Sequence, residues 1–252
     1  MKYPISVTIL TKNSEKYLRE VLESLLLFDQ VLLFDTGSVD KTLDIAAEFS
    51  HTTIVRGSFN GFGPAHNLAS GLAKHDWILS IDSDEILTRE LAEEIASLSL
   101  EKGWVYSFPR RNEYRGKWIR GCGWHPDRQV RLYNRKETSF TEAHVHEAIQ
   151  TAGLKEKRLQ GAIRHYSYGE VSDFLQKMQH YSRLFAEQHQ GKKKASLSTA
   201  VLHAFFAFFK AYCLKGGILM GREGFEISFY NANTAFYKYL KLAEANERLK
   251  DH

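Results

Sequence analysis

Three acidic residues, Asp82, Asp84 and Glu85, directly follow residues 77–81, an apolar run that is typical of a buried strand. Their mutual repulsion would be costly in a site that excludes water, unless a cation lay between them. Mg²⁺ and Mn²⁺ prefer oxygen ligands, and Mg²⁺ is commonly bound by one or two carboxylates together with substrate phosphates. This Asp-x-Asp therefore predicts a divalent cation that bridges the protein and a diphosphate. Short acidic tripeptides are also common on surfaces, so it is the position after a strand that strengthens the prediction.

Polar residues also follow two other predicted strands. Thr11 and Asn13 come after residues 5–10, and Asp35 comes after residues 31–34. Ligands of open α/β sheets bind at the carboxyl ends of the strands, so the polar segments converge on one edge. Turn and cap chemistry also favours Asp, Ser, Asn and Gly in such places. Three independent segments together favour a ligand site.

The elements that must position these residues alternate between strand-like and helix-like periods over residues 1–100. The predicted strands are 5–10, 31–34, 53–55 and 77–81; the predicted helices are 14–27, 41–49, 65–73 and a segment that begins at 88. This alternation predicts an α/β fold, with a mostly parallel sheet flanked by helices.

The remaining chain divides into two segments. Residues 101–168 have the pattern of mixed strand and loop, and we expect them to form the second half of the same domain as residues 1–100. Residues 169–252 have a helical pattern and form a predicted C-terminal region. Within it, residues 197–214 are strongly apolar and aromatic, but the uninterrupted stretch is shorter than the roughly 20 residues of a membrane span. A core helix and a helix that lies in the membrane interface both fit this pattern.

A glycine-containing stretch, residues 60–67, precedes one predicted helix. Its glycines would let the backbone approach a phosphate, and the helix N-terminus offers free N–H donors. The stretch lacks the Gly-Lys-Ser/Thr of a Walker loop and does not match GxGxxG. An ordinary kinase or nicotinamide enzyme is therefore disfavoured.

Charge and cysteine content narrow the partners and the compartment. The chain of 252 residues has a net charge of +4, and residues 110–136 hold nine Lys or Arg against two acids. Such a block favours phosphates, an anionic membrane or nucleic acid, although a solvated surface also explains it. Two distant cysteines support neither a disulfide framework nor a cysteine zinc site. Together with an N-terminus unlike a signal peptide, this predicts a cytoplasmic protein.

Residues 5–85 resemble the family-2 glycosyltransferases, whose nucleotide-sugar-binding domain has the GT-A fold. ISVTILTKNSEKYLREVLESL is similar to their opening strand, loop and helix, and VLLFDTGSVDKT to their Val-Val-Asp-Asp-Gly-Ser-Thr-Asp segment. GFGPAHNLASGLAKHDWILSIDSDE is similar to their Gly-x-x-x-Ala-x-Asn segment and the Asp-x-Asp after it. Two positions depart from the pattern: Thr36 replaces the second Asp of the usual pair, and His66 stands where Arg is frequent.

The resemblance implies roles for the matching residues. Residues 1–100 would bind the nucleotide sugar, and Asp84 would hold Mg²⁺ or Mn²⁺ on the diphosphate while Asp82 faces the ribose or the metal. Glu85 would support these residues or merely begin the next helix. The residues expected to line the nucleotide-sugar site are Thr11, Asn13, Asp35, Gly63, Asn67, Asp82 and Ser83.

An inverting transfer needs a base that removes the proton from the acceptor hydroxyl. The Val-His-Glu element at residues 145–147 resembles one in bacterial enzymes that build the lipopolysaccharide inner core. This resemblance implies Glu147 as the base, and Glu142 is the alternative candidate. His144 and His146 alternate as on a strand, which suggests zinc or, without an evident third ligand, ordinary supporting histidines. The residues predicted to meet the acceptor or its phosphates are Trp124, Arg128, Arg131 and His146.

Residues 209–225 extend the resemblance to lipopolysaccharide-core β-glucosyltransferases that act on a heptose. The implied reaction moves glucose from a UDP-sugar to a saccharide or glycolipid acceptor, with peripheral contact to the anionic inner face of the cytoplasmic membrane and no nucleic acid. The alternatives are another donor or acceptor, a sugar-nucleotide pyrophosphorylase, or a non-catalytic carbohydrate-binding module. The first strand lacks the Gly-rich basic loop expected of a pyrophosphorylase.

Overall fold

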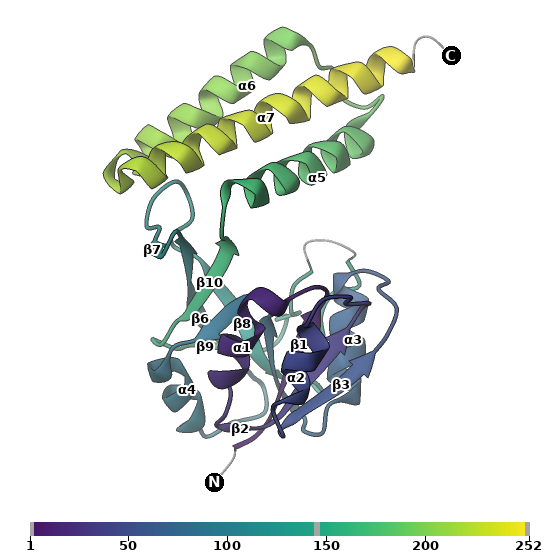
Figure 1. Cartoon of the computed structure of the whole chain (residues 1–252), viewed down its shortest axis with the longest axis vertical. Helices are drawn as coiled ribbons and strands as arrows, with labels where there is room; N and C mark the ends of the chain where they lie inside the picture. The colour runs from purple at the N-terminus through teal and green to yellow at the C-terminus, as the bar shows by residue number, and fades with distance from the viewer. Residues whose placement is uncertain (1–2, 144–146, 250–252) are drawn as a thin grey trace. The chain divides into compact units, whose positions relative to one another are not determined.

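The computed structural model describes residues 3–143 and 147–249, which form two compact units (Figure 1). Unit 1 comprises Met1–Arg111 and Asp127–His165, and unit 2 comprises Asn112–Pro126 and Tyr166–His252. The chain passes between them three times: within β6 (Trp104–Tyr114), between Pro126 and Asp127, and within β10 (Ile163–Tyr168). Residues 112–126 therefore group with the C-terminal helices, although they lie inside the segment that the sequence suggested as the second half of the first domain.

The sheet of unit 1 begins with four parallel strands in the order β3-β2-β1-β4. These are β1 (Tyr3–Thr11), β2 (Phe28–Asp35), β3 (Thr52–Arg56) and β4 (Trp77–Asp82). The order continues through β8 (Arg128–Asn134), β6, β10 and β5 (Glu85–Leu87), and β9 (Lys155–Arg158) pairs in parallel with β6. The β4–β8, β8–β6 and β10–β5 pairs are antiparallel. The predicted α/β fold is confirmed, and the sheet is parallel in its first half and mixed beyond it.

Helices flank this sheet. They are α1 (Glu15–Glu23), α2 (Thr42–Ala47), α3 (Phe62–Leu72) and α4 (Arg89–Ala96). α1 packs beside α2, and α3 packs against β1 and β2. The central strands are nearly continuous apolar runs because both faces of the sheet are covered: Val31 through Phe34 of β2 are at most 1% exposed.

The register of the parallel strands places the polar segments together. Thr11 pairs with Asp35 across β1 and β2, and Leu10 pairs with Asp82 across β1 and β4. The carboxyl ends of three strands therefore meet at one edge of the sheet, as the sequence predicted.

Unit 2 is mainly helical, and its helical C-terminal region confirms the predicted one. It contains α5 (Val171–His189), α6 (Leu197–Phe209) and α7 (Arg222–Arg248); a π-helical turn η1 (Lys210–Leu214) and a 3-10 turn η2 (Gly217–Met220) connect the last two. Both α5 and α6 pack along α7. The short strand β7 (Lys117–Trp118) pairs with the end of β6. An aromatic cluster that includes Tyr114, Trp124, Tyr168, Phe174 and Tyr230 forms part of its core.

Substitution of two glycines of α3 would test how tightly this helix packs. A Cβ at Gly63 would overlap the carbonyl oxygen of Thr141, whereas one at Gly71 would meet no atom within 4 Å. We expect Gly63→Ala to lower the free energy of unfolding by about 1–3 kcal/mol, because backbone would have to shift. Gly71→Ala should raise it by about 0.5–1 kcal/mol, because alanine favours the helix. Urea unfolding followed by circular dichroism measures both, and equal effects would contradict this packing.

Candidate active site

Asp35 is the centre of a hydrogen-bonded cluster at the end of β2. Its carboxylate accepts the backbone N–H groups of Gly37 and Ser38 and the hydroxyls of Ser38 and Thr11, the last at 3.3 Å. Burial raises the pKa of Asp35, but these hydrogen bonds outweigh it and hold the pKa below its ordinary value. Asp35 is therefore an ionised acceptor beside Thr11, held in place by several hydrogen bonds.

Asn13 joins the loops that follow β1 and β2. Its backbone has a positive φ of 53°, a conformation that asparagine adopts more readily than most residues. Its N–H donates to Ser38 Oγ at 2.9 Å, and its side-chain Oδ1 accepts the N–H of Val39 at 2.9 Å. The predicted nucleoside residues Thr11, Asn13 and Asp35 are thus brought together.

The three acids of the opening motif have three different environments. The Oδ2 of Asp82 accepts a hydrogen bond from Arg131 Nη2 at 2.8 Å. Glu85 is fully buried, and its Oε1 accepts from Arg131 Nη2 and Arg110 Nη1, both at 3.2 Å. Its Oε2 accepts the backbone N–H of Asp82 at 3.0 Å. Glu85 is the first residue of β5 and lies before α4, so the suggestion that it begins a helix is wrong.

Two arginines thus compensate for the repulsion among these acids. Arg110 is itself held by Asp127, whose Oδ2 lies 2.8 Å from Arg110 Nε. Burial raises the pKa of Asp82, but Arg131 and the other basic side chains around it together outweigh burial and keep the pKa well below its usual range. Burial raises the pKa of Glu85 above its ordinary value, against the lowering effect of Arg131. We call Asp82, Glu85, Arg110, Asp127 and Arg131 the ion network.

Asp84 stands apart from the ion network. Its side chain is 33% exposed, and its Oδ1 lies 3.6 Å from His165 Nε2. His165 belongs to β10, where it pairs with Glu85 of β5. His165 was not predicted as a site residue, because a histidine in the mixed strand and loop pattern of residues 101–168 carries no specific signal. Asp84 and Asp82, which is 39% exposed, are the acids of the motif that a ligand could reach.

Helix α3 positions the chain that leads to the predicted base. The Nδ2 of Asn67 donates to Phe140 O at 3.0 Å and to Glu142 Oε1 at 2.8 Å, while its Oδ1 accepts the N–H of Phe140. The N–H of Gly63 donates to Ala143 O at 3.1 Å. The close approach that Gly63 permits is therefore to this segment of the same chain, and its role toward a phosphate stays a prediction.

Glu147 lies beside a buried histidine. Its Oε1 is 4.0 Å from His66 Nε2, and its side chain is 20% exposed. His66 stacks on Phe140 at 4.4 Å, and its Nδ1 is 3.2 Å from Ser80 Oγ. Burial lowers the pKa of His66 to about 4, so the imidazole is neutral near pH 7. Glu147 also interacts electrostatically with Arg131, the residue that holds Asp82.

The other predicted residues are placed as follows. The guanidinium of Arg128 donates to the carbonyl oxygens of Ser107 at 2.9 Å and Leu159 at 3.1 Å. Ser83 Oγ is 2.9 Å from Ser14 Oγ. Trp124 belongs to unit 2, where it stacks on Tyr168 at 5.4 Å. His144 and His146 lie outside the described residues.

The acids at the end of β4 suit a cation that is bound partly by the protein and partly by a substrate. Among residues 3–143 and 147–249, no group of three or more His, Cys, Asp and Glu side chains is arranged to hold a metal ion. Asp82 and Asp84 supply partly exposed carboxylate oxygens, which fits Mg²⁺ or Mn²⁺ bound by two carboxylates and substrate phosphates.

Comparison with known proteins identifies the family. Residues 6–159 match the family described as Glycosyl transferase family 2. The chain belongs to this family. It is therefore a glycosyltransferase with the GT-A fold, as the sequence motifs predicted. The match includes every residue of the strand ends described above and Glu147.

Relatives also match nearly the whole chain. An uncharacterized glycosyltransferase of Rickettsia felis is 30% identical over 97% of this chain and 90% of its own length. The lipopolysaccharide core biosynthesis glycosyltransferase LpsC of Rhizobium meliloti is 25% identical over 96% of this chain and 92% of its own length. Among solved structures, Staphylococcus aureus TarS 1-349 in complex with UDP-GlcNAc is 14% identical, with a TM-score of 0.48, and covers 100% of this chain and 92% of that one.

The buried His66 predicts a pH dependence of stability. Its pKa is about 4 in the folded protein and 6.5 in the unfolded chain, so only the unfolded chain takes up a proton between these values. Stability should therefore fall as pH falls through this window, by about 3 kcal/mol from this residue.

Urea unfolding at several pH values from 7 to 4 measures the effect. The variant His66→Gln should lose this share of the pH dependence, while His180→Gln, at an exposed position of α5, should keep it. Equal pH profiles for the two variants would contradict the assignment.

Proposed function

We propose that this glycosyltransferase moves glucose from UDP-glucose to a saccharide acceptor, a heptose of the lipopolysaccharide inner core, with inversion at the anomeric carbon and with a divalent cation. The observation that carries the proposal is the convergence of Glu147 with the strand-end acids. Glu147 approaches His66 at 4.0 Å and interacts with Arg131, which holds Asp82 at 2.8 Å. A carboxylate at this place suits a base that faces the donor sugar.

The residues at the ends of the strands would bind the nucleotide-sugar donor. Asp35 and Thr11 would bind the nucleoside by hydrogen bonds, with Asn13 holding their loops in place. Asp82 would face the ribose and the cation, and Arg131 keeps its carboxylate ionised and oriented. Gly63, Asn67 and Ser83 would complete this site, Asn67 by fixing the segment before Glu147.

Asp84 and Asp82 would hold the Mg²⁺ or Mn²⁺ ion together with the substrate phosphates. Such a cation stabilises the charge that develops on the departing diphosphate. Arg131 and Arg110 are directed to Asp82 and Glu85.

Glu147 would act on the acceptor. As the acceptor oxygen bonds to the anomeric carbon, Glu147 takes the hydroxyl proton and the bond from that carbon to the diphosphate breaks. His66, 4.0 Å from Glu147, is neutral near pH 7, so it does not donate a proton to the carboxylate there. Trp124, Arg128, Arg131 and His146 remain the residues proposed for the acceptor or its phosphates.

The acceptor class is supported by the relative LpsC, whose name assigns it to lipopolysaccharide core biosynthesis, over 96% of this chain. The basic block at residues 110–136 suits a phosphorylated acceptor. A lipid-borne acceptor also places the protein peripherally on the inner face of the cytoplasmic membrane.

A transfer assay over UDP-, GDP- and other nucleotide sugars, with Mg²⁺ or Mn²⁺ and a core-heptose acceptor, tests the proposal. We expect UDP-glucose to be preferred and Glu147→Gln to lower kcat by about 10²-fold or more, since general-base catalysis contributes this much. Glu142→Gln is the matched control, because that carboxylate is engaged by Asn67, and it should retain most of the activity.

Unchanged transfer by Glu147→Gln together with loss in Glu142→Gln would move the base to Glu142. A clear preference for another nucleotide sugar would refute the assigned donor. No turnover of the wild-type chain with any donor would favour a carbohydrate-binding module.

A further inference from the structure

The outer face of α6 is apolar and exposed. Its side chains repeat at helical spacing and are between 43% and 63% exposed: Val201, Leu202, Phe205, Phe206 and Phe209. From Leu197 to Phe209 the helix carries no Lys, Arg, Asp or Glu. Soluble monomers rarely expose apolar patches of this kind without a binding role.

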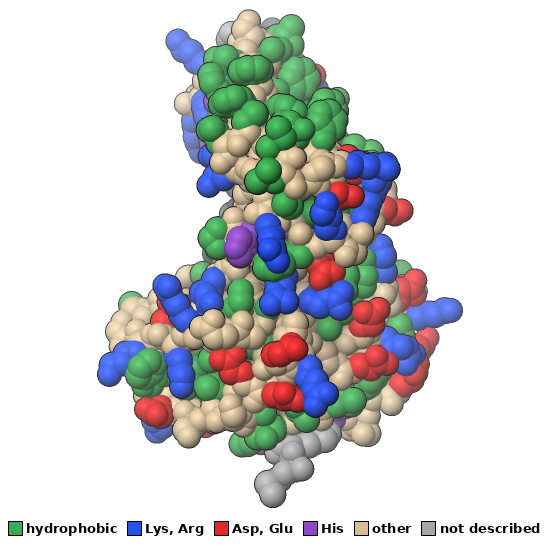
Figure 2. Space-filling model, turned by 90° about the vertical axis from the view of Figure 1, so that its left-hand side faces the viewer, with side chains coloured by type: hydrophobic (Ala, Val, Ile, Leu, Met, Phe, Trp, Pro, Cys, Tyr) green, Lys and Arg blue, Asp and Glu red, His purple; other side chains and the backbone are tan. Residues whose placement is uncertain are grey.

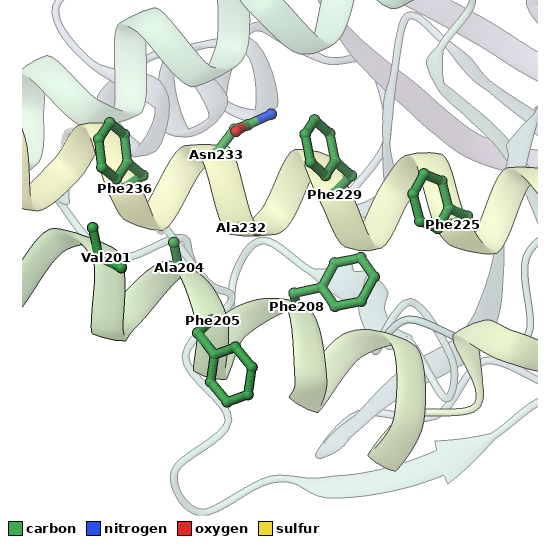
Figure 3. Close-up of a pocket in the computed structure, with 9 residues that line it drawn as sticks. All are labelled: Val201, Ala204, Phe205, Phe208, Phe225, Phe229, Ala232, Asn233 and Phe236. Carbon is green, nitrogen blue, oxygen red and sulfur yellow. The ribbon is translucent and has the colours of Figure 1, made fainter.

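The apolar surface continues beyond α6. Leu214, Ile218 and Leu219, in the turns after the helix, are 68%, 57% and 79% exposed. Between α6 and α7 lies a groove of about 600 Å³ to which α7 contributes Phe225, Phe229 and Phe236 (Figure 3). Figure 2 shows hydrophobic side chains gathered over the helices of unit 2, with Lys and Arg side chains near them.

Basic residues are concentrated in the sequence around this surface, and the last of them, Arg222, is paired with Glu226 of α7 at 2.7 Å. Residues 188–222 contain no Asp or Glu but six basic residues: Lys192, Lys193, Lys194, Lys210, Lys215 and Arg222. Three precede α6, and two occur in or just after the π-helical turn that follows it. An apolar, Phe-rich helix face bordered by Lys and Arg is the pattern of a helix that lies in the interface of an anionic bilayer.

We infer that the exposed face of α6, together with Leu214, Ile218 and Leu219, binds the surface of a bilayer that contains anionic lipids. Residues Leu197–Leu214 are long and apolar enough to cross a membrane by length and composition, and only 11% of that stretch is buried. However, α6 packs along α7, which carries Lys241, Glu244 and Glu247. Crossing would draw those charges into hydrocarbon, so α6 lies on the membrane and does not span it.

This inference deepens the proposed function. Only the role that we assign to membrane binding, which is to hold the enzyme beside a lipid-borne acceptor, rests on that function. The binding itself does not require catalysis. The two proposals can therefore fail separately.

Sedimentation with vesicles of phosphatidylcholine, with and without phosphatidylglycerol, tests the inference on the full chain. We expect binding to the mixed vesicles that weakens at high salt, and weak binding to pure phosphatidylcholine. The triple variant Phe205→Gln, Phe206→Gln and Phe209→Gln should bind the mixed vesicles about tenfold more weakly or worse, because the apolar insertion is lost. The matched control is Leu68→Gln with Leu72→Gln, two α3 side chains that are each 50% exposed, and it should bind like the wild type.

Absence of vesicle binding by the wild type, or equal binding by the triple variant, would overturn the inference. Dimerisation of the wild type in sedimentation equilibrium, lost in the triple variant and without vesicle binding, would assign the face to a second copy of the chain instead. Retention in the membrane pellet after alkaline washing would show a spanning helix and overturn the interfacial placement. Vesicle binding without transfer to a soluble acceptor fragment would count against the proposed function alone.

Discussion

The ion network is the interaction on which the site depends. Three acids within four residues of the chain would repel one another at the end of β4, and Arg131 and Arg110 supply the compensating charge for two of them. Removing one partner of such a buried set leaves an unpaired charge, which typically costs about 3–5 kcal/mol. Because Glu85 is fully buried and bound to the backbone N–H of Asp82, it fixes the turn that carries Asp84, whose side chain is partly exposed. The network therefore separates a structural acid, Glu85, from an acid available to a ligand, Asp84.

A second set of contacts positions Glu147, the proposed base, near the ion network. Asn67 fixes the backbone at Phe140, and Phe140 stacks on His66, which approaches Glu147. Arg131 is common to both sets, since it holds Asp82 and Glu85 and also attracts Glu147. Residues far apart in the sequence thereby converge around Arg131, where we propose that the donor sugar and the acceptor hydroxyl meet.

Much of this arrangement was predictable from the sequence. The parallel strands are apolar runs that end in polar residues, and their motif order identified the family. The strand β9 was missed because Lys155–Arg158 is exposed throughout and has no apolar alternation. The partners of Glu85 were missed because Arg110 and Arg131 come from β6 and β8, and strand pairing at long range leaves no periodic signal in the sequence. Arg131 was selected for phosphate binding on its charge alone, and its contacts with Asp82 and Glu85 became visible only in the fold.

The most direct test compares two acids that are one position apart. Titration of Mn²⁺ in the presence of UDP, followed by the electron paramagnetic resonance of free Mn²⁺, measures cation binding without catalysis. Asp84→Asn should weaken Mn²⁺ binding at least about tenfold, because one of two protein carboxylates is lost. Glu85→Gln keeps a buried side chain whose amide oxygen can still accept the N–H of Asp82, so the folded variant should lose much less Mn²⁺ affinity than Asp84→Asn. Normal binding by Asp84→Asn together with loss of binding in a folded Glu85→Gln variant would contradict the account.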